Sequence, residues 1–502
     1  MNIFPCRGSC ATLFSWALPR CRTALRCLIG ALWLGAAAAF AAPLAYLADR
    51  NQNDVSVVEM TTYSTLTAIS LGAARASPVE LVANEASGKI FVALGTGVAI
   101  IDPRTNALAG EIPLALIKAM VVSPDGKKVY ALTPGSVSVI DTDSKSVAAT
   151  LAVDPSAVSL SIDADGETIY VAHTGLEPGT ENALGAAGIT LINGLSPEIE
   201  NVVSTGDFRP DRLAVNPGDD RLYMLGNVGL AADEHAYRIF DPVTSVITRV
   251  ALVLPPQTPA IAGFTSLAFN QDGSRLYLGG HTFGVTSIPV LEVDTAAGTV
   301  ARVLRVPPGF ADEHTALKLA TSFANDKFVL IVFVKERLNS AMFEPGRRAV
   351  FMEVAGGLIV SDFQAPSPGD TDLLTGDILD SAPAPTQGKA PTSTVLQANA
   401  NPPLRPTLPV TFMATVTGNN PTGKVVFRFT ARGDYHHHRM VQKVRVPLEG
   451  GMATLALPAC NTAWDNAALQ KIACSPEFKV VAKFRGDPFN ARSRSEALHE
   501  SY

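Results

Sequence analysis

The stretch that decides the fold is KVYALTPGSVSVIDTDSKSVAATLAV (residues 128–153), which is followed by SIDADGETIYVAH (161–173). Apolar and polar residues alternate along it, a spacing typical of β-strands with one buried face. The Asp-Gly pair in DADGE is a hairpin signal. The stretch therefore predicts consecutive short antiparallel strands joined by tight turns.

The same pattern recurs along the chain. Each copy has an aromatic strand, a loop, a second strand that ends in VID or a similar sequence, two more strands and a turn such as SPDG. Seven copies follow one another at spacings of about 40 to 55 residues. Four short strands repeated seven times predict an all-β, seven-bladed β-propeller. The aromatic strands are LAYLA (44–48), KIFVAL (89–94), KVYAL (128–132), TIYVAH (168–173), RLYML (221–225), RLYLGG (275–280) and KFVLIV (327–332).

On these motifs, residues 43–380 resemble the YVTN family of bacterial β-propellers, whose layout is close to that of WD-repeat proteins. The resemblance implies four-stranded blades in an exported protein and no single activity. It makes VELVAN (79–84) an inner strand, so the chain enters the ring at the second strand of a blade. We expect TDLLTGDIL (371–379) to supply the missing inner strand and remove the free edge. The expected propeller spans residues 42–380.

The first 41 residues predict a signal peptide. An apolar run, CLIGALWLGAAAAF (27–40), follows an acid-free segment rich in arginine, and Ala39-Phe40-Ala41 fits an A-x-A cleavage site. The alternative is a retained membrane anchor, although the run is shorter than the roughly 20 residues that span a bilayer. We expect bacterial Sec export to the periplasm, the cell surface or the medium. The arginines are Arg7, Arg20, Arg22 and Arg26.

A second domain follows a Pro/Ala-rich linker at 381–391. Residues 392–502 alternate as the strands of a β-sandwich do. They resemble a bacterial Ig-like repeat of the kind found in cell-surface proteins. The matching motifs are VTFMATVTG, PTGKVVF, GGMATL and AKFRGDPFNARS, and the chain departs from the family at insertions in 432–440 and 459–476.

The two insertions carry cysteines and histidines. Cys460 and Cys474 are the only cysteines outside the predicted signal peptide, so in an oxidising compartment we expect one disulfide. This disulfide would either stabilise the fold or form part of a recognition loop. His436 and His438 would share one face of a strand and form a weak metal pair, with an exposed polar hairpin as the alternative.

Charge divides unevenly between the expected domains. The formal net charge of the chain is −6, and it becomes −10 when the four signal-peptide arginines are removed. Residues 42–391 hold 23 Lys+Arg against 39 Asp+Glu, a balance of −16, while residues 392–502 hold 13 against 7, a balance of +6. A nucleic-acid partner is therefore not expected. The basic domain could bind an anionic envelope surface, or its positive charges could belong to an ordinary solvated face.

Polar residues gather in the longer loops of the later repeats, which under this layout open on one face of the ring. The tetrapeptide ADEH occurs there twice, and two carboxylates beside an imidazole can bind a metal or exchange protons. Ordinary solvated loop residues are the alternative, since no HExxH, GxSxG, Walker or CxxCH motif is present. The candidate ligand-binding residues are His173, Asp233, Glu234, His235, His281, Asp312, Glu313 and His314.

These features predict an exported, non-enzymatic binding or scaffold protein without a cofactor. Its loop-rich propeller face would bind a protein, glycan or small molecule, and the Ig-like domain would position it. The alternative is an enzyme, a metal-assisted hydrolase or lyase that uses the His/acid cluster of the same face, which rests on analogy with other propellers.

Overall fold

A computed structural model describes most of the chain. Residues 1–41 and Ala42–Tyr502 are separate units, and the predicted signal peptide lies outside the described residues. No helix among those residues is long and apolar enough to cross a membrane. The described residues are 43–501 except 51, 73–77, 85, 178–179, 181, 230, 233–234, 243, 257, 260, 284–287, 307–312, 325–326, 338–346, 355–357, 364–372, 380–391, 400–409, 422, 433–438, 458, 461–473, 476 and 485–492.

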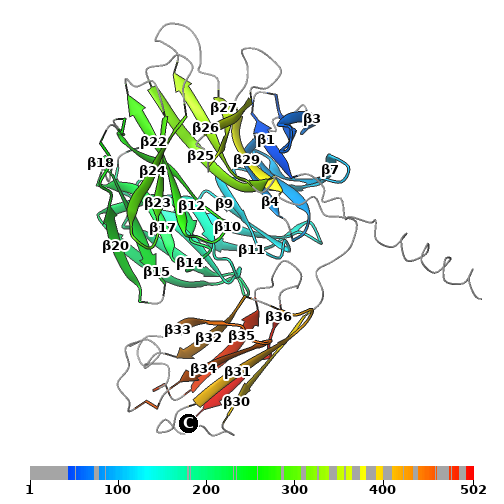
Figure 1. The fold of residues 1–502 in the computed structure, drawn as a ribbon, viewed down its shortest axis with the longest axis vertical. Helices are drawn as coiled ribbons and strands as arrows, with labels where there is room; N and C mark the ends of the chain where they lie inside the picture. The colour runs from blue at the N-terminus through cyan, green and yellow to red at the C-terminus, as the bar shows by residue number, and fades with distance from the viewer. Residues whose placement is uncertain are drawn as a thin grey trace, which may run out of the picture. The chain divides into compact units, whose positions relative to one another are not determined.

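Four-stranded antiparallel sheets follow one another from the N-terminal side (Figure 1). The first three complete repeats are β4 (Pro78–Asn84), β5 (Lys89–Leu94), β6 (Gly97–Asp102) and β7 (Ala107–Pro113); β8 (Ala119–Val122), β9 (Lys128–Thr133), β10 (Ser136–Asp141) and β11 (Ser146–Ala152); and β12 (Ala157–Ile162), β13 (Thr168–His173), β14 (Ala187–Asn193) and β15 (Ile199–Gly206). The next is β16 (Phe208–Val215), β17 (Leu222–Val228), β19 (Ala236–Asp241) and β20 (Val246–Ala251), with β18 (Ala231–Ala232) on β17.

The later repeats merge into one eight-stranded sheet. Its first half is β21 (Gly263–Phe269), β22 (Arg275–Phe283), β23 (Ile288–Asp294) and β24 (Thr299–Val306), and its second half is β25 (Glu313–Ala324), β26 (Lys327–Arg337), β27 (Arg347–Glu353) and β28 (Leu358–Phe363). The halves join where the end of β22 pairs with the start of β25. Because two expected blades are continuous in one sheet, the number of seven blades stays a prediction.

The two ends of this region meet. β29 (Leu373–Leu379) pairs antiparallel with β1 (Leu44–Asp49), which continues through β2 (Asp54–Glu59) to β3 (Ser64–Ser70). In Figure 1 the yellow β29 lies beside the blue β1. The predicted closing strand is therefore confirmed. First strands of successive sheets also pack in a closed order, which is β4, β8, β12, β16, β21, β25, β29 and back to β4. This closed ring of sheets is a β-propeller, called the propeller region below.

Alternating side chains bind each sheet to its neighbours. Along β13, Ile169 and Val171 pack with Tyr130 of the preceding sheet. Tyr170, which points the other way, packs with Leu222 and other side chains of the following sheet. The sequence placed these aromatic strands second in each repeat, and the sheet orders confirm it.

The expected turn chemistry is also present. Asp141 Oδ1 accepts the backbone N–H groups of Asp143 and Ser144 at 3.1 and 2.7 Å, as predicted for the aspartate that ends a VID strand. The glycines of SPDGK and DADGE, Gly126 and Gly166, have φ of 71° and 70°, which favours glycine. Pro124 packs against Gly166, since a Cβ there would lie 2.7 Å from Pro124 Cδ. The turns of neighbouring sheets therefore hold one another in place.

The C-terminal part, called the C-terminal sandwich below, has two facing sheets. One is β30 (Ser393–Ala398), β31 (Val410–Thr417) and β34 (Met452–Leu457). The other runs in the order β33 (Arg439–Pro447), β32 (Lys424–Arg432), β35 (Glu477–Phe484) and β36 (Ser493–Arg494), with β37 (Leu498–Ser501) on β35. Phe412, Phe429 and Phe478 meet in the core between the sheets. The all-β class predicted from the sequence is confirmed.

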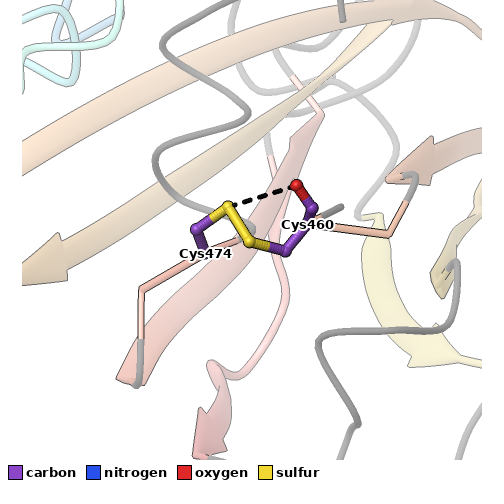
Figure 2. Close-up of a disulfide and its surroundings, with 2 residues drawn as sticks. All are labelled: Cys460 and Cys474. Carbon is purple, nitrogen blue, oxygen red and sulfur yellow. Dashed lines mark hydrogen bonds between the residues drawn. A yellow bond between two sulfur atoms is a disulfide. The ribbon is translucent and has the colours of Figure 1, made fainter. Parts of the chain in front are cut away.

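The predicted disulfide is present between Cys460 and Cys474, whose Cα atoms are 4.9 Å apart. Cys474 Sγ lies 3.5 Å from the Cys460 carbonyl oxygen (dashed line in Figure 2). This is a close contact and not a hydrogen bond, because a disulfide sulfur has no proton to donate. The bond closes a loop across a sequence separation of 14 residues. His436, His438 and the expected linker at 381–391 lie outside the described residues.

Candidate functional site

His173 is the last residue of β13 and is buried, next to the loop that follows the strand. Only 4% of its surface is exposed, and its Nδ1 donates a hydrogen bond to the Ala186 carbonyl at 3.2 Å. Burial lowers the pKa of His173, although Asp154, 3.9 Å from Nδ1, and the Ala186 carbonyl act in the opposite direction. At neutral pH we therefore take His173 as an uncharged donor that ties down the loop after β13.

Asp154, Ser156 and His173 have the composition of a catalytic triad but not its connections. Ser156 Oγ donates to Asp154 Oδ1 at 2.6 Å and accepts the Gly175 N–H at 2.8 Å. A nucleophilic serine instead donates to the histidine that removes its proton. These bonds fasten the loop that begins at Thr174 to the turn before β12. This arrangement lies outside the predicted site residues, and its only signal in the sequence is the D-x-S spacing at 154–156.

The far side of the His173 ring is also closed. A Cβ on Gly188 would lie 2.9 Å from His173 Nε2 and 2.6 Å from the Val203 carbonyl oxygen. Among the described residues Nε2 has no hydrogen-bond partner and is buried. His173 therefore packs closely against β14.

His235 also serves the backbone. Its φ of 52° lies in the left-handed region, and its Nε2 donates to the Ile261 carbonyl at 3.2 Å. The next residue, Ala262, donates its N–H to the His281 carbonyl at 2.8 Å. The side chain of His235 and the backbone carbonyl of His281 therefore both contact the segment that leads into β21.

His314 joins this place through strand pairing. It lies opposite Thr282, while His281 lies opposite Thr315 and Phe283 opposite Glu313. The sequence placed His281, Glu313 and His314 in loops, which is wrong, because β22 extends to Phe283 and β25 begins at Glu313. Pairing between the two expected blades extends both strands.

The structure thus brings three of the four propeller histidines to the joint of β21, β22 and β25 and leaves His173 with β12–β14. Asp233, Glu234 and Asp312 lie outside the described residues, as do the side chains of Glu313 and His314. Within the described part of the chain, no three His, Cys, Asp or Glu residues are grouped so that they could hold a metal ion.

A charged contact that the sequence analysis did not predict lies at the other end of β13. The outer face of the β33-β32-β35 sheet carries Arg428 on β32, Lys443 and Arg445 on β33, and Lys483 on β35. Strand register puts Arg428 opposite Lys443, and Val426 opposite both Arg445 and Lys483. The intervening residues, such as Phe427 and Phe429, fill the core. We call these four cations the basic sheet face.

The basic sheet face meets carboxylates of two propeller turns. Arg428 lies 2.8 Å from Glu167 and Lys443 2.7 Å from Asp163, both in the turn between β12 and β13. Lys483 also pairs with Glu167. We call 163–167 and 216–220 the acidic turns. The second turn supplies the remaining contacts, in which Arg445 pairs with Asp220 and donates to the Gly218 carbonyl at 2.8 Å.

Burial and neighbouring charge act on these groups in opposite directions. Burial alone lowers the pKa of Lys443, but Asp163, Asp165 and Asp220 outweigh it and raise the pKa overall. Burial also lowers the pKa of Arg428, against the effect of Glu200 and Asp163, yet a guanidinium stays protonated. Lys443 and Arg428 therefore remain charged beside the carboxylates at neutral pH.

The comparisons with known proteins add no function. No protein-family model and no curated protein matches the chain. Among solved structures, it is similar to a hydrazine synthase of Kuenenia stuttgartiensis, with 15% identity, a TM-score of 0.43, and coverage of 59% of this chain and 97% of that one. It is also similar to the β-propeller domain of Cps50 (Swd1) of Myceliophteria thermophila, with 13% identity, a TM-score of 0.41, and coverage of 58% and 86%.

Proposed function

We propose that the protein is an exported, non-enzymatic binding or scaffold protein, with a propeller of the YVTN type and a C-terminal module of the Ig-like type. One observation carries the proposal. One ring nitrogen of each histidine, His173 Nδ1 and His235 Nε2, donates to a backbone carbonyl, that of Ala186 or Ile261, so these imidazoles hold loops in place. Loops held on a rigid ring are suited to recognition.

The ligand would be a protein, glycan or small molecule at the loop-bearing ends of the second strands. The first complete repeat joins β5 to β6 through Gly95 and Thr96 alone, whereas the third joins β13 to β14 through residues 174–186. The long loop is anchored by Arg209, which donates to the Thr174 carbonyl, and by Ser156. A long, anchored loop on one repeat offers a defined surface that the short connection does not.

A loop exchange tests this proposal. Residues 174–186 are replaced by Gly-Thr, as in the first complete repeat, and wild type and variant are compared on glycan arrays and in capture of envelope proteins. We expect wild type to retain specific ligands that the folded variant loses. Identical binding by both proteins would contradict this use of the loop. Sequencing the exported chain, which we expect to begin at Ala42, tests export separately.

The alternative function, a metal-assisted hydrolase or lyase, is favoured by one observation. Strand pairing brings His281 near Glu313, which lies opposite Phe283, two residues further along β22. Its test is metal analysis of untagged protein in which His436, His437 and His438 are replaced, so that this triple cannot bind metal. A stoichiometric metal that is lost in His281→Ala would support the metal site on which this alternative depends, and metal-free protein would contradict it.

A further inference from the structure

The contact between the basic sheet face and the acidic turns has the properties of a built interface. Asp163 and Glu167 side chains are each 1% exposed, and their partners Lys443, Arg428 and Lys483 are 16%, 8% and 12% exposed. Burying a charge is costly unless an opposite charge meets it. Here four cations of one sheet face meet three carboxylates of two neighbouring turns, so each buried charge has a counter-charge.

Bonds within the propeller region orient the turns that carry these carboxylates, independently of the cations. Asp163 Oδ1 accepts the Glu167 N–H at 2.7 Å, and the Gly166 N–H bonds to the Asp163 carbonyl at 3.0 Å. Asp220 has a φ of 59°, and its N–H bonds to the Asn216 carbonyl at 2.9 Å. Asn216 Nδ2 in turn donates to the Gly273 carbonyl of the next repeat. Fixed acceptors lower the ordering cost of docking.

The contact also leaves the candidate ligand face free. The turn 163–167 precedes β13 and the loop 174–186 follows it, so the two lie at opposite ends of a six-residue strand, roughly 20 Å long. Whatever the long loops bind is therefore not obstructed by the basic sheet face.

We propose that the acidic turns of the propeller are a docking site for the basic sheet face of the chain's own C-terminal sandwich, and that the two regions act as one rigid body. This goes beyond the proposed binding function, which would hold for a freely swinging module as well. The sequence-based expectation of an anionic envelope surface assigned the same positive charge to an external partner. Here the counter-charge is the chain's own.

Single-molecule energy transfer on the chain from Ala42 onward, which holds both regions and none of the four signal-peptide cysteines, tests the docking. Dyes are attached at cysteines that replace Leu66 on β3 and Met452 on β34, two exposed residues outside the contact. Cys460 and Cys474 are joined to each other and do not react. We expect one narrow population of transfer efficiency in the wild-type protein at neutral pH.

The test variant combines Lys443→Glu, Arg445→Glu and Lys483→Glu. Its matched control combines Arg104→Glu, Arg249→Glu and Arg305→Glu, exposed residues of the propeller region, and changes the net charge equally. A milder variant, Lys443→Gln with Arg445→Gln and Lys483→Gln, gives the answer if the reversal triple does not fold. Near-ultraviolet circular dichroism checks folding in each case.

We expect the test variants to replace the narrow population with a broad one at shifted mean efficiency, while the control stays narrow. Glu167→Arg should open the contact in the same way, and combining it with Arg428→Glu and Lys483→Glu should restore the narrow population. A broad wild-type distribution would overturn the proposal. So would a folded test variant that stays narrow, or a control that opens equally. Failure of the loop exchange would leave this result unaffected, because the two tests involve opposite ends of β13.

Discussion

The two ends of β13 use polar residues in different ways. At the loop end, His173, Ser156 and Asp154 bond to one another or to nearby backbone, and they hold a long loop in place. At the turn end, backbone bonds orient Asp163 and Glu167, but their carboxylates meet cations of a different sheet. Clustered polar side chains therefore indicate loop anchoring in one place and docking in the other, and only their partners distinguish the two.

The largest expected effect is at the turn end. Glu167→Gln removes the counter-charge of both Arg428 and Lys483 in a buried site, which should destabilise the docked state by about 3–5 kcal/mol. Trp464, the only tryptophan outside the predicted signal peptide, allows denaturant unfolding of the C-terminal sandwich to be followed by fluorescence. The control is Glu198→Gln at an exposed position, for which a change within about 0.5 kcal/mol is expected. Equal effects of the two variants would contradict this assignment.

A smaller effect is expected from Gly188→Ala at the loop end. The added Cβ would lie 2.6 Å from the Val203 carbonyl and 2.9 Å from His173 Nε2, so overpacking should cost about 1–3 kcal/mol. The matched control is Gly185→Ala, where the nearest atom to the new Cβ is Asp154 Oδ2 at 3.8 Å. Thermal unfolding followed by circular dichroism measures both. A Gly188→Ala protein as stable as the control would show that His173 is not tightly packed.

Ser156→Ala tests the loop anchor itself. The variant loses one hydrogen bond to Asp154 and one from the Gly175 N–H, and a net loss of about 1–2 kcal/mol is expected. Hydrogen exchange at Gly175 should accelerate, whereas exchange in the acidic turns at the other end of β13 should not change. Faster exchange at both ends would mean that the ends are coupled, and the comparison between them would fail.

The smallest effect expected is a dependence on pH. The pKa of His173 is lowered in the folded protein, so its contribution to stability is present above about pH 6.5 and is lost as the pH falls through the folded pKa. Between pH 8 and pH 5 the melting temperature of the wild type should therefore fall more than that of His173→Gln. Parallel curves would show that His173 does not titrate differently on unfolding.

Much of the fold could be predicted because it depends on local patterns. KIFVAL and TIYVAH coincide with β5 and β13, and Asp141 makes the turn bonds that its position implied. The closing strand β29 followed from the need to pair an edge. The merged sheet of the later repeats could not be predicted, because the pairing of β22 with β25 depends on long-range register.

The candidate site was predicted less well for a related reason. His235 and His281 do lie close to one segment, but the sequence could not show that His173 and His235 bond to backbone carbonyls. The basic sheet face could be predicted from the sequence only in part. Arg428, Lys443 and Arg445 occupy alternate, outward positions of two strands, and the charge balances of −16 and +6 showed that the two regions differ. What was missing was the partner of those charges, which only the folded chain provides.

The most direct test of the docking is a double-mutant cycle on Glu167 and Lys483. The single variants Glu167→Gln and Lys483→Gln and their combination are compared with wild type by the stability of the C-terminal sandwich in the chain from Ala42 onward, followed through Trp464. Because the two side chains pair in a buried contact, we expect a coupling energy above about 1 kcal/mol. Effects that add to within about 0.5 kcal/mol would show that the two charges do not interact, and would contradict the docking of the sandwich on the acidic turns.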